Sequence, residues 1–404
     1  MRKLNRVEVD FLAILVNISL FSYVEPISGV PNTGFLISFI ILLRYLSFGI
    51  NFTSLFLLFA TYNVLIVLKN QCNTDILKSL ASLILVFLFA LGIKNITEQL
   101  VKESDFFLHR KINQIFKFLI FTNLFSIAFE KVVLGSARPS GVFFSEPSHA
   151  AFLIVPITLL FALQHNIVFV ALGLLSMILA YSSSGIATLL ILLVSIYAFL
   201  LFRAVIFLRV GRFQAGFMII TFLLVLIALT DPNTVDRLNG LLSNSNDSSD
   251  RNLSSLVYLN GWLAAFEYLK QTSYFGIGFN LMGCEGGIET DLKSVIVDIA
   301  DAYLNYNDGS FLLSKMLSEF GLLSIFILLF LSFNFLKMFH LIIISAFFKR
   351  PMQYFTKLGF ALYSASFAFI FVRSTDYFSL SLIYMMIGYY LFHNGRLLSL
   401  EPPK

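Results

Sequence analysis

Runs of about 20 apolar residues recur along most of the chain, and short polar segments separate them. A run of this length matches the helix that is needed to cross a bilayer, and it lacks the strict alternation of barrel strands. The expected fold class is therefore an all-α polytopic membrane protein with about twelve transmembrane helices. The predicted spans are residues 9–27, 33–50, 52–69, 77–95, 112–133, 148–165, 166–181, 184–202, 213–230, 312–334, 354–372 and 377–394.

Two regions leave the exact number of helices open. The run at 166–181 is short, and the stretch 311–348 is long enough for one tilted helix or for two short ones. An error in either region alone would move the C-terminus to the other side of the membrane. With twelve spans, both termini lie on one side.

Clusters of basic residues indicate which side is cytoplasmic. They precede the first span and join spans 4 and 5, 8 and 9, and 10 and 11, which the positive-inside rule places in the cytoplasm. The residues concerned are Arg2, Lys3, Arg6, Lys94, Lys102, Arg110, Lys111, Arg203, Arg209, Arg212, Lys349, Arg350 and Lys357. The same alternation places the segments 131–148 and 231–310 together on the outer face.

The chain is accordingly expected to have three parts. Residues 1–230 hold nine helices and the short outer segment 131–148, residues 231–310 form a large outer loop, and residues 311–404 hold the last three helices.

Composition excludes the soluble classes. The chain is 58% hydrophobic and 13% charged, with a mean hydropathy of +0.85. The net charge of +5 does not indicate a nucleic-acid partner, because in a membrane protein the placement of basic residues matters more than their sum. No group of histidine, cysteine and carboxylate residues has metal-ligand spacing, so no metal or cofactor is expected.

The large outer loop contains a predicted helix. After the polar run 244–250, apolar residues recur at helical spacing around Trp262. The spacing predicts an amphipathic helix that lies on the membrane face. Its apolar residues are Leu256, Leu259, Leu263, Phe266 and Leu269.

The first outer segment concentrates the candidate chemistry. Arg138 precedes a proline, and Glu146 precedes Pro147 at the expected start of a helix. Arg138 can be a headgroup anchor and Glu146 an acid near the helix start. Alternatively, the fork of Arg138 binds a phosphate or diphosphate, and Glu146 acts nearby as a base.

In its motifs the chain resembles a known family, the bacterial O-antigen polymerases (Wzy), and more distantly the O-antigen ligases. The block from Arg138 to the Glu146-Pro147-Ser148 step carries most of the resemblance. Weaker matches follow further along the chain. They are the serine-rich turn 181–185, Arg251, Trp262, the Gly-x-Gly turn at Gly276 and Gly278, and the stretch from Asp308 to Gly321.

The resemblance implies a metal-independent glycosyltransferase with a GT-C-like fold in the bacterial inner membrane. It implies that the enzyme joins oligosaccharide repeat units carried on undecaprenyl diphosphate at the periplasmic face. Donor and acceptor are then both lipid-linked, and a chain-length-regulating co-polymerase is an expected partner.

The resemblance also implies roles for individual residues. Arg138 would neutralise the departing diphosphate, with Arg251 and Arg373 as further outer cations. Glu146 would orient or deprotonate the acceptor hydroxyl, with Asp308 as the second candidate. Gly141, Ser148 and Trp262 are the remaining expected substrate-binding residues.

Two alternatives remain open. An O-antigen ligase uses the same donor, but the ligases share a histidine in the large outer loop, and residues 231–310 contain none. A flippase or transporter for the same lipid-linked sugar would show two related halves, which this sequence does not. Lys315 and Glu319, four residues apart, are expected to pair with each other rather than to act in catalysis.

Overall fold

The apolar runs fold as helices. The computed structural model describes residues 3–22, 31–69, 76–103, 106–136, 139–141, 144, 146–180, 182–206, 253–283, 288–300, 304, 309–347, 352–373 and 376–400. Within these ranges the chain forms helices and turns and no β-strand. Five helices there are long and apolar enough to cross a membrane, namely Phe52–Lys69, Ile76–Glu103, Phe106–Val132, Leu323–Ser345 and Tyr354–Val372. The chain is thus a helical membrane protein.

The first eight predicted spans each correspond to a helix. The short run at 166–181 is a helix of its own, and the ninth predicted span, 213–230, lies outside the described residues. The helices are α1 (Arg6–Phe21), α2 (Thr33–Leu42) with the 3-10 turn η1 (Leu43–Tyr45), α3 (Ile50–Lys69), α4 (Ile76–Glu103), α5 (Phe106–Val132), α6 (Pro147–Leu163), α7 (Ile167–Leu179) and α8 (Ser183–Ile206).

The described residues from 253 onward form six more helices. They are α11 (Leu253–Gln271), α12 (Asp291–Ala300), α13 (Leu312–Phe320), α14 (Leu323–Phe347), α15 (Tyr354–Val372) and α16 (Leu380–Leu400). The region 311–348 is therefore two helices, of which the first has only 9 residues. The break falls at Gly321, whose φ of 58° lies in the left-handed region that glycine adopts readily.

The buried core extends over most of the bundle, and α6, α15 and α16 contribute many of its residues. Most residues of α6 are buried, as expected for a helix that is apolar on all sides. The backbones of α15 and α16 approach closely at Gly359 and Gly388, where an added Cβ on Gly388 would lie 2.7 Å from the Gly359 carbonyl oxygen. Small residues at such crossings let membrane helices pack backbone to backbone.

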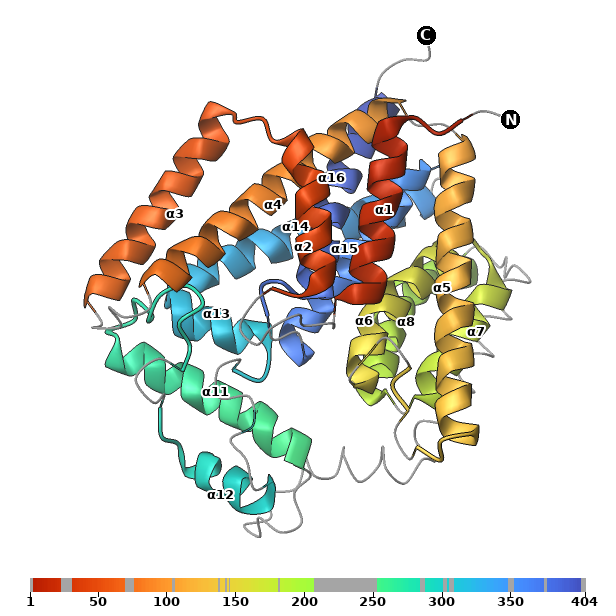
Figure 1. The fold of residues 1–404 in the computed structure, drawn as a ribbon. Helices are drawn as coiled ribbons and strands as arrows, with labels where there is room; N and C mark the ends of the chain where they lie inside the picture. The colour runs from red at the N-terminus through yellow and green to blue at the C-terminus, as the bar shows by residue number, and fades with distance from the viewer. Residues whose placement is uncertain are drawn as a thin grey trace.

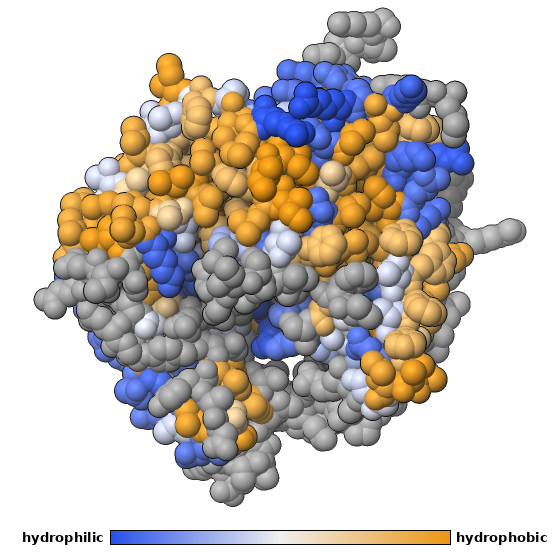
Figure 2. Space-filling view, in the orientation of Figure 1, coloured by the Kyte–Doolittle hydropathy of each residue, from blue (hydrophilic) through white to orange (hydrophobic). Residues whose placement is uncertain are grey.

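Two helices at the periphery keep apolar side chains on the surface. Leu58 of α3 and Phe326 of α14 are each 67% exposed. Figure 2 shows hydrophobic residues over much of the upper part of the molecule, with hydrophilic residues gathered at its top and towards its lower end. This distribution suits a protein whose sides contact lipid.

Different helices lie at the two ends of the helix bundle. The start of α1 and the end of α16 lie at the same end, whereas α11 and α12 lie at the opposite end (Figure 1). The predicted helix around Trp262 is confirmed as α11. Its predicted apolar stripe is divided, because Leu256 and Leu269 are buried while Leu259, Leu263 and Phe266 stay exposed.

Candidate functional site

Glu146 and Arg373 form an ion pair between the ends of two helices. Glu146 is the N-cap residue of α6, its side chain makes no capping bond, and Pro147 occupies the first helical position. Arg373 is the C-cap residue of α15. Arg373 Nη2 lies 2.5 Å from Glu146 Oε2, although the two residues are 227 positions apart in the sequence. Both charges lie at the helix end that favours them, since a helix is positive at its start and negative at its end.

The electrostatics keep Glu146 ionised. Its partial burial raises the pKa of the carboxyl, but the charge and hydrogen bond of Arg373 outweigh that effect and hold the pKa below its ordinary value of 4.5. His149 and a hydrogen bond from Ser148 Oγ, at 3.1 Å, act in the same direction. The Glu146 side chain is 46% exposed and that of Arg373 is 27% exposed. The pair is therefore within reach of a ligand from solvent.

Two other predicted site residues that the structure describes contact other side chains. Gly141 is buried with a φ of 88°, and an added Cβ there would lie 3.0 Å from Asn123 Oδ1 of α5. Trp262 is half-buried on α11, with its ring centroid 5.0 Å from that of Phe311. Glu146, Ser148 and Arg373 are thus the predicted site residues that the structure brings together.

Three predicted residues lie outside the described part of the chain. They are Arg138, Arg251 and Asp308. Among the described residues, no group of three or more histidine, cysteine and acidic residues has the arrangement of a metal site.

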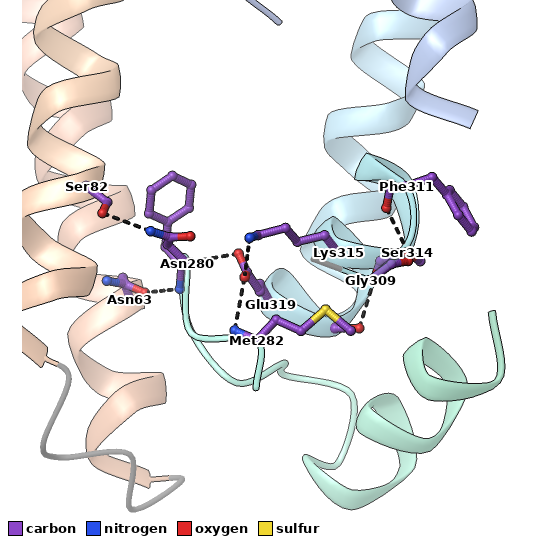
Figure 3. Close-up of polar contacts among 11 residues, drawn as sticks. Asn63, Ser82, Asn280, Met282, Gly309, Phe311, Ser314, Lys315 and Glu319 are labelled. Atoms are coloured by element: carbon purple, nitrogen blue, oxygen red, sulfur yellow. Dashed lines mark hydrogen bonds and ion pairs between the residues drawn. The ribbon is translucent and has the colours of Figure 1, made fainter. Parts of the chain in front are cut away.

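A second cluster of charge is buried on α13. Lys315 and Glu319 pair on α13, as their spacing predicts, with 3.8 Å between Nζ and Oε1. Their side chains are only 4% and 0% exposed. The Glu319 carboxylate also accepts the backbone N–H groups of Asn280, at 2.7 Å, and of Met282, at 3.2 Å (Figure 3). This carboxylate therefore binds a turn far from it in sequence.

That turn is the predicted Gly-x-Gly motif. Gly276 and Gly278 have φ values of 84° and 110°, which only glycine adopts readily, and the Gly278 N–H donates to the Glu319 carbonyl. Beyond them, Phe279 N–H donates to Asn63 Oδ1 of α3 at 2.7 Å, and Asn280 Nδ2 donates to Ser82 Oγ of α4 at 3.0 Å. Residues 276–282, called the Gly-x-Gly turn below, thus join α3, α4 and α13.

Sequence reasoning missed the partners of this turn. Asn63 and Ser82 are polar residues inside predicted membrane spans, and this is the signal that could have identified them. Nothing in their spacing shows which distant segment they bind.

A small cavity lies between α11 and α12. Its lining includes Gly261, Met282 and Gly309, and its volume is about 30 Å³. That is the space of about one water molecule, so a sugar ring does not fit there.

No family model matches the chain, and no curated protein matches it.

Proposed function

We propose that this chain is a polymerase of lipid-linked oligosaccharides, similar to the bacterial O-antigen polymerases. In this proposal it is a GT-C-like glycosyltransferase of twelve transmembrane helices in the bacterial inner membrane, with its active site at the periplasmic face. Its donor and acceptor are repeat units on undecaprenyl diphosphate, and a co-polymerase regulates the chain length.

The ion pair between Glu146 and Arg373 is the observation that carries the proposal. The polymerization reaction needs a cation for a leaving diphosphate and a carboxylate for an acceptor hydroxyl. Glu146, which a sequence motif suggested as the base, and Arg373, which was expected only as a further outer cation, are 227 positions apart, yet they touch at a partly exposed place. A carboxylate and an arginine fork at one site suit group transfer from an anionic leaving group.

The transfer step follows from these groups. The acceptor hydroxyl oxygen attacks the anomeric carbon of the growing chain, and the bond from that carbon to the diphosphate oxygen breaks. The hydroxyl proton passes to the Glu146 carboxylate, and the diphosphate departs with its additional negative charge. Arg373 neutralises that charge, together with Arg138 and Arg251.

The ion pair also affects when Glu146 can act. While Arg373 holds the carboxylate, its lowered pKa makes it a weak base. A diphosphate that binds the Arg373 fork withdraws this charge from Glu146, and the pKa of Glu146 then rises. The base thus becomes stronger when the donor is in place.

Complementation of a deletion strain tests the proposal. Loss of the gene is expected to leave single repeat units on the lipopolysaccharide core, and wild type restores a ladder of longer chains. Arg373→Lys keeps the charge but loses the bidentate fork, and Glu146→Gln loses the base, so both are expected to give little polymer at normal protein level. The measurement is the lipopolysaccharide gel pattern.

Arg44→Lys is the matched control. Arg44 also pairs with a carboxylate, that of Asp10 at 3.6 Å, but near the start of α1. It should therefore keep the ladder. Full ladders from both site variants would remove the pair from the mechanism. A deletion strain that accumulates polymer on its lipid carrier would indicate a ligase, and one with neither product outside would indicate a flippase.

A further inference from the structure

We infer that the outer end of the molecule positions Arg373 through two contacts that bracket it in sequence, one made by Tyr258 and the other by the buried Glu319 cluster. Tyr258 and Glu319 are positioning residues, since neither of them is paired with Glu146. The inference rests on the proposed function only in that it makes Arg373 a site residue.

The first contact holds the end of α15. The Tyr258 hydroxyl of α11 donates a hydrogen bond of 3.1 Å to the carbonyl oxygen of Phe371, two residues before Arg373. Carbonyls in the last turn of a helix lack partners within the helix, so this bond satisfies one of them. The Tyr258 ring is itself fixed, because it stacks on Phe311 with 4.6 Å between centroids.

The second contact holds the chain after Arg373. The ring of Tyr377, four residues on, lies 4.3 Å from the ring of Phe279 and 5.5 Å below the Lys315 ammonium group. The Tyr377 hydroxyl is buried and faces the Glu319 carboxylate, with which it interacts electrostatically. Glu319 therefore meets both the Gly-x-Gly turn and the loop that follows Arg373.

The burial of Glu319 makes this arrangement specific. Its carboxylate is out of contact with water, so its charge must be compensated by Lys315 and by the N–H groups of Asn280 and Met282. A buried pair of this kind adds little net stability compared with apolar residues, whereas loss of one partner is costly. What the pair supplies here is one allowed position for the Gly-x-Gly turn against α13 (Figure 3).

Four variants test the inference in purified full-length protein. Tyr258→Phe removes only a hydroxyl and is expected to fold, and Glu319→Gln removes the buried charge. Tyr354→Phe is the control for Tyr258→Phe. Tyr354 lies at the opposite end of α15 from Arg373, and its hydroxyl donates to Asn113. Glu289→Gln is the control for Glu319→Gln, because Glu289 pairs with Lys293 at the same spacing but is 83% exposed.

We expect hydrogen exchange of residues 371–379 to rise in Tyr258→Phe and Glu319→Gln and to stay unchanged in both controls. Displacement of Arg373 by about 1 Å should lower polymer formation on lipid-linked substrate about ten- to a hundredfold. The acid limb of the pH–activity profile should also shift to higher pH. The reason is that the Arg373 charge, which lowers the pKa of Glu146, is then further away. His149 and Ser148, which also face Glu146, remain in place.

The outcomes separate the two proposals. Unchanged exchange in residues 371–379 and an unmoved acid limb in Tyr258→Phe would overturn the positioning role. A rate of polymer formation that falls by the same factor at every pH would also overturn the positioning role, since a general loss of structure has that effect. Raised exchange in Tyr258→Phe, combined with full polymer formation in Arg373→Lys, would uphold the bracket around Arg373 and reject the proposed use of that arginine.

Discussion

The charge of Glu146 depends on a partner that only the folded chain supplies. Its pKa is lower in the folded protein than in the unfolded chain, so the pair adds stability above the ordinary pKa of 4.5, and this stability is lost as the pH falls through the lower folded value. The carboxylate is nearly half exposed, and solvent screening therefore limits the contribution to at most about 1 kcal/mol.

We accordingly expect Glu146→Gln to unfold more easily than wild type at neutral pH and to match it at a pH well below 4. The measurement is the free energy of unfolding in detergent as a function of pH. Glu267→Gln is the control, because Glu267 forms an ion pair with Lys270 on α11. A stability difference that persists unchanged at low pH would show that the ion pair is not its source.

Local spacing predicted some residue contacts and not others. Lys315 and Glu319 lie one helical turn apart, so their pairing follows from the sequence alone. Glu146 was selected from its position before Pro147, and Arg373 only from its place on the predicted outer face. That these two meet could not be predicted, because hydrophobic periodicity describes single helices and carries no information about which helix ends come together.

At the scale of helices, α15 and α16 cross with their backbones in close contact. An added Cβ on Gly388 would lie 2.6 Å from the Tyr363 backbone nitrogen, and backbone cannot move aside as a flexible side chain can. Gly388→Ala should therefore cost about 1–3 kcal/mol of folding free energy, as overpacking does.

The yield of folded protein and its thermal unfolding in detergent measure this cost. Gly49→Ala is the control, because an added Cβ at Gly49 meets nothing within 4 Å and should change stability by less than about 0.5 kcal/mol. Equal stability of the two variants would mean that the helices can separate at the crossing without cost.

The presence of a helix in each described apolar run was predictable, whereas some helix ends and the helix faces were not: α4, predicted over 77–95, extends over Ile76–Glu103. Apolar runs mark where a helix lies, but in a membrane protein both the buried and the lipid-facing sides are apolar. On α11 the expected stripe mixes the two, since Leu256 is buried and Leu263 is exposed. Whether 311–348 forms one helix or two was not predictable, because apolar residues continue past the break at Gly321.

At the scale of the whole molecule, the distribution of basic residues predicts the orientation of the protein in the membrane. Both described chain ends lie opposite α11 and α12 (Figure 1). In a variant without Cys72 and Cys284, a cysteine in place of Ser294 on α12 should react with a membrane-impermeant maleimide added to intact cells. A cysteine in place of Lys102, exposed near the end of α4, should react only after the cells are opened.

Labelling of both positions in intact cells would contradict the predicted orientation. Labelling of Lys102→Cys alone in intact cells would show the opposite orientation, and the proposed periplasmic site would then face the cytoplasm.

The contacts around Arg373 also determine when during synthesis the site can form. Asn32, near the start of α2, donates a hydrogen bond of 2.7 Å to the Phe378 carbonyl oxygen, which is 346 positions away in the sequence. Glu146 and Arg373 are 227 positions apart. A chain inserted from its N-terminus therefore holds Glu146 and Glu319 without Arg373 and Tyr377 until the loop before α16 has emerged. Nascent chains that stop before this loop have no complete site, so truncated products carry the scaffold of the protein and none of its proposed chemistry.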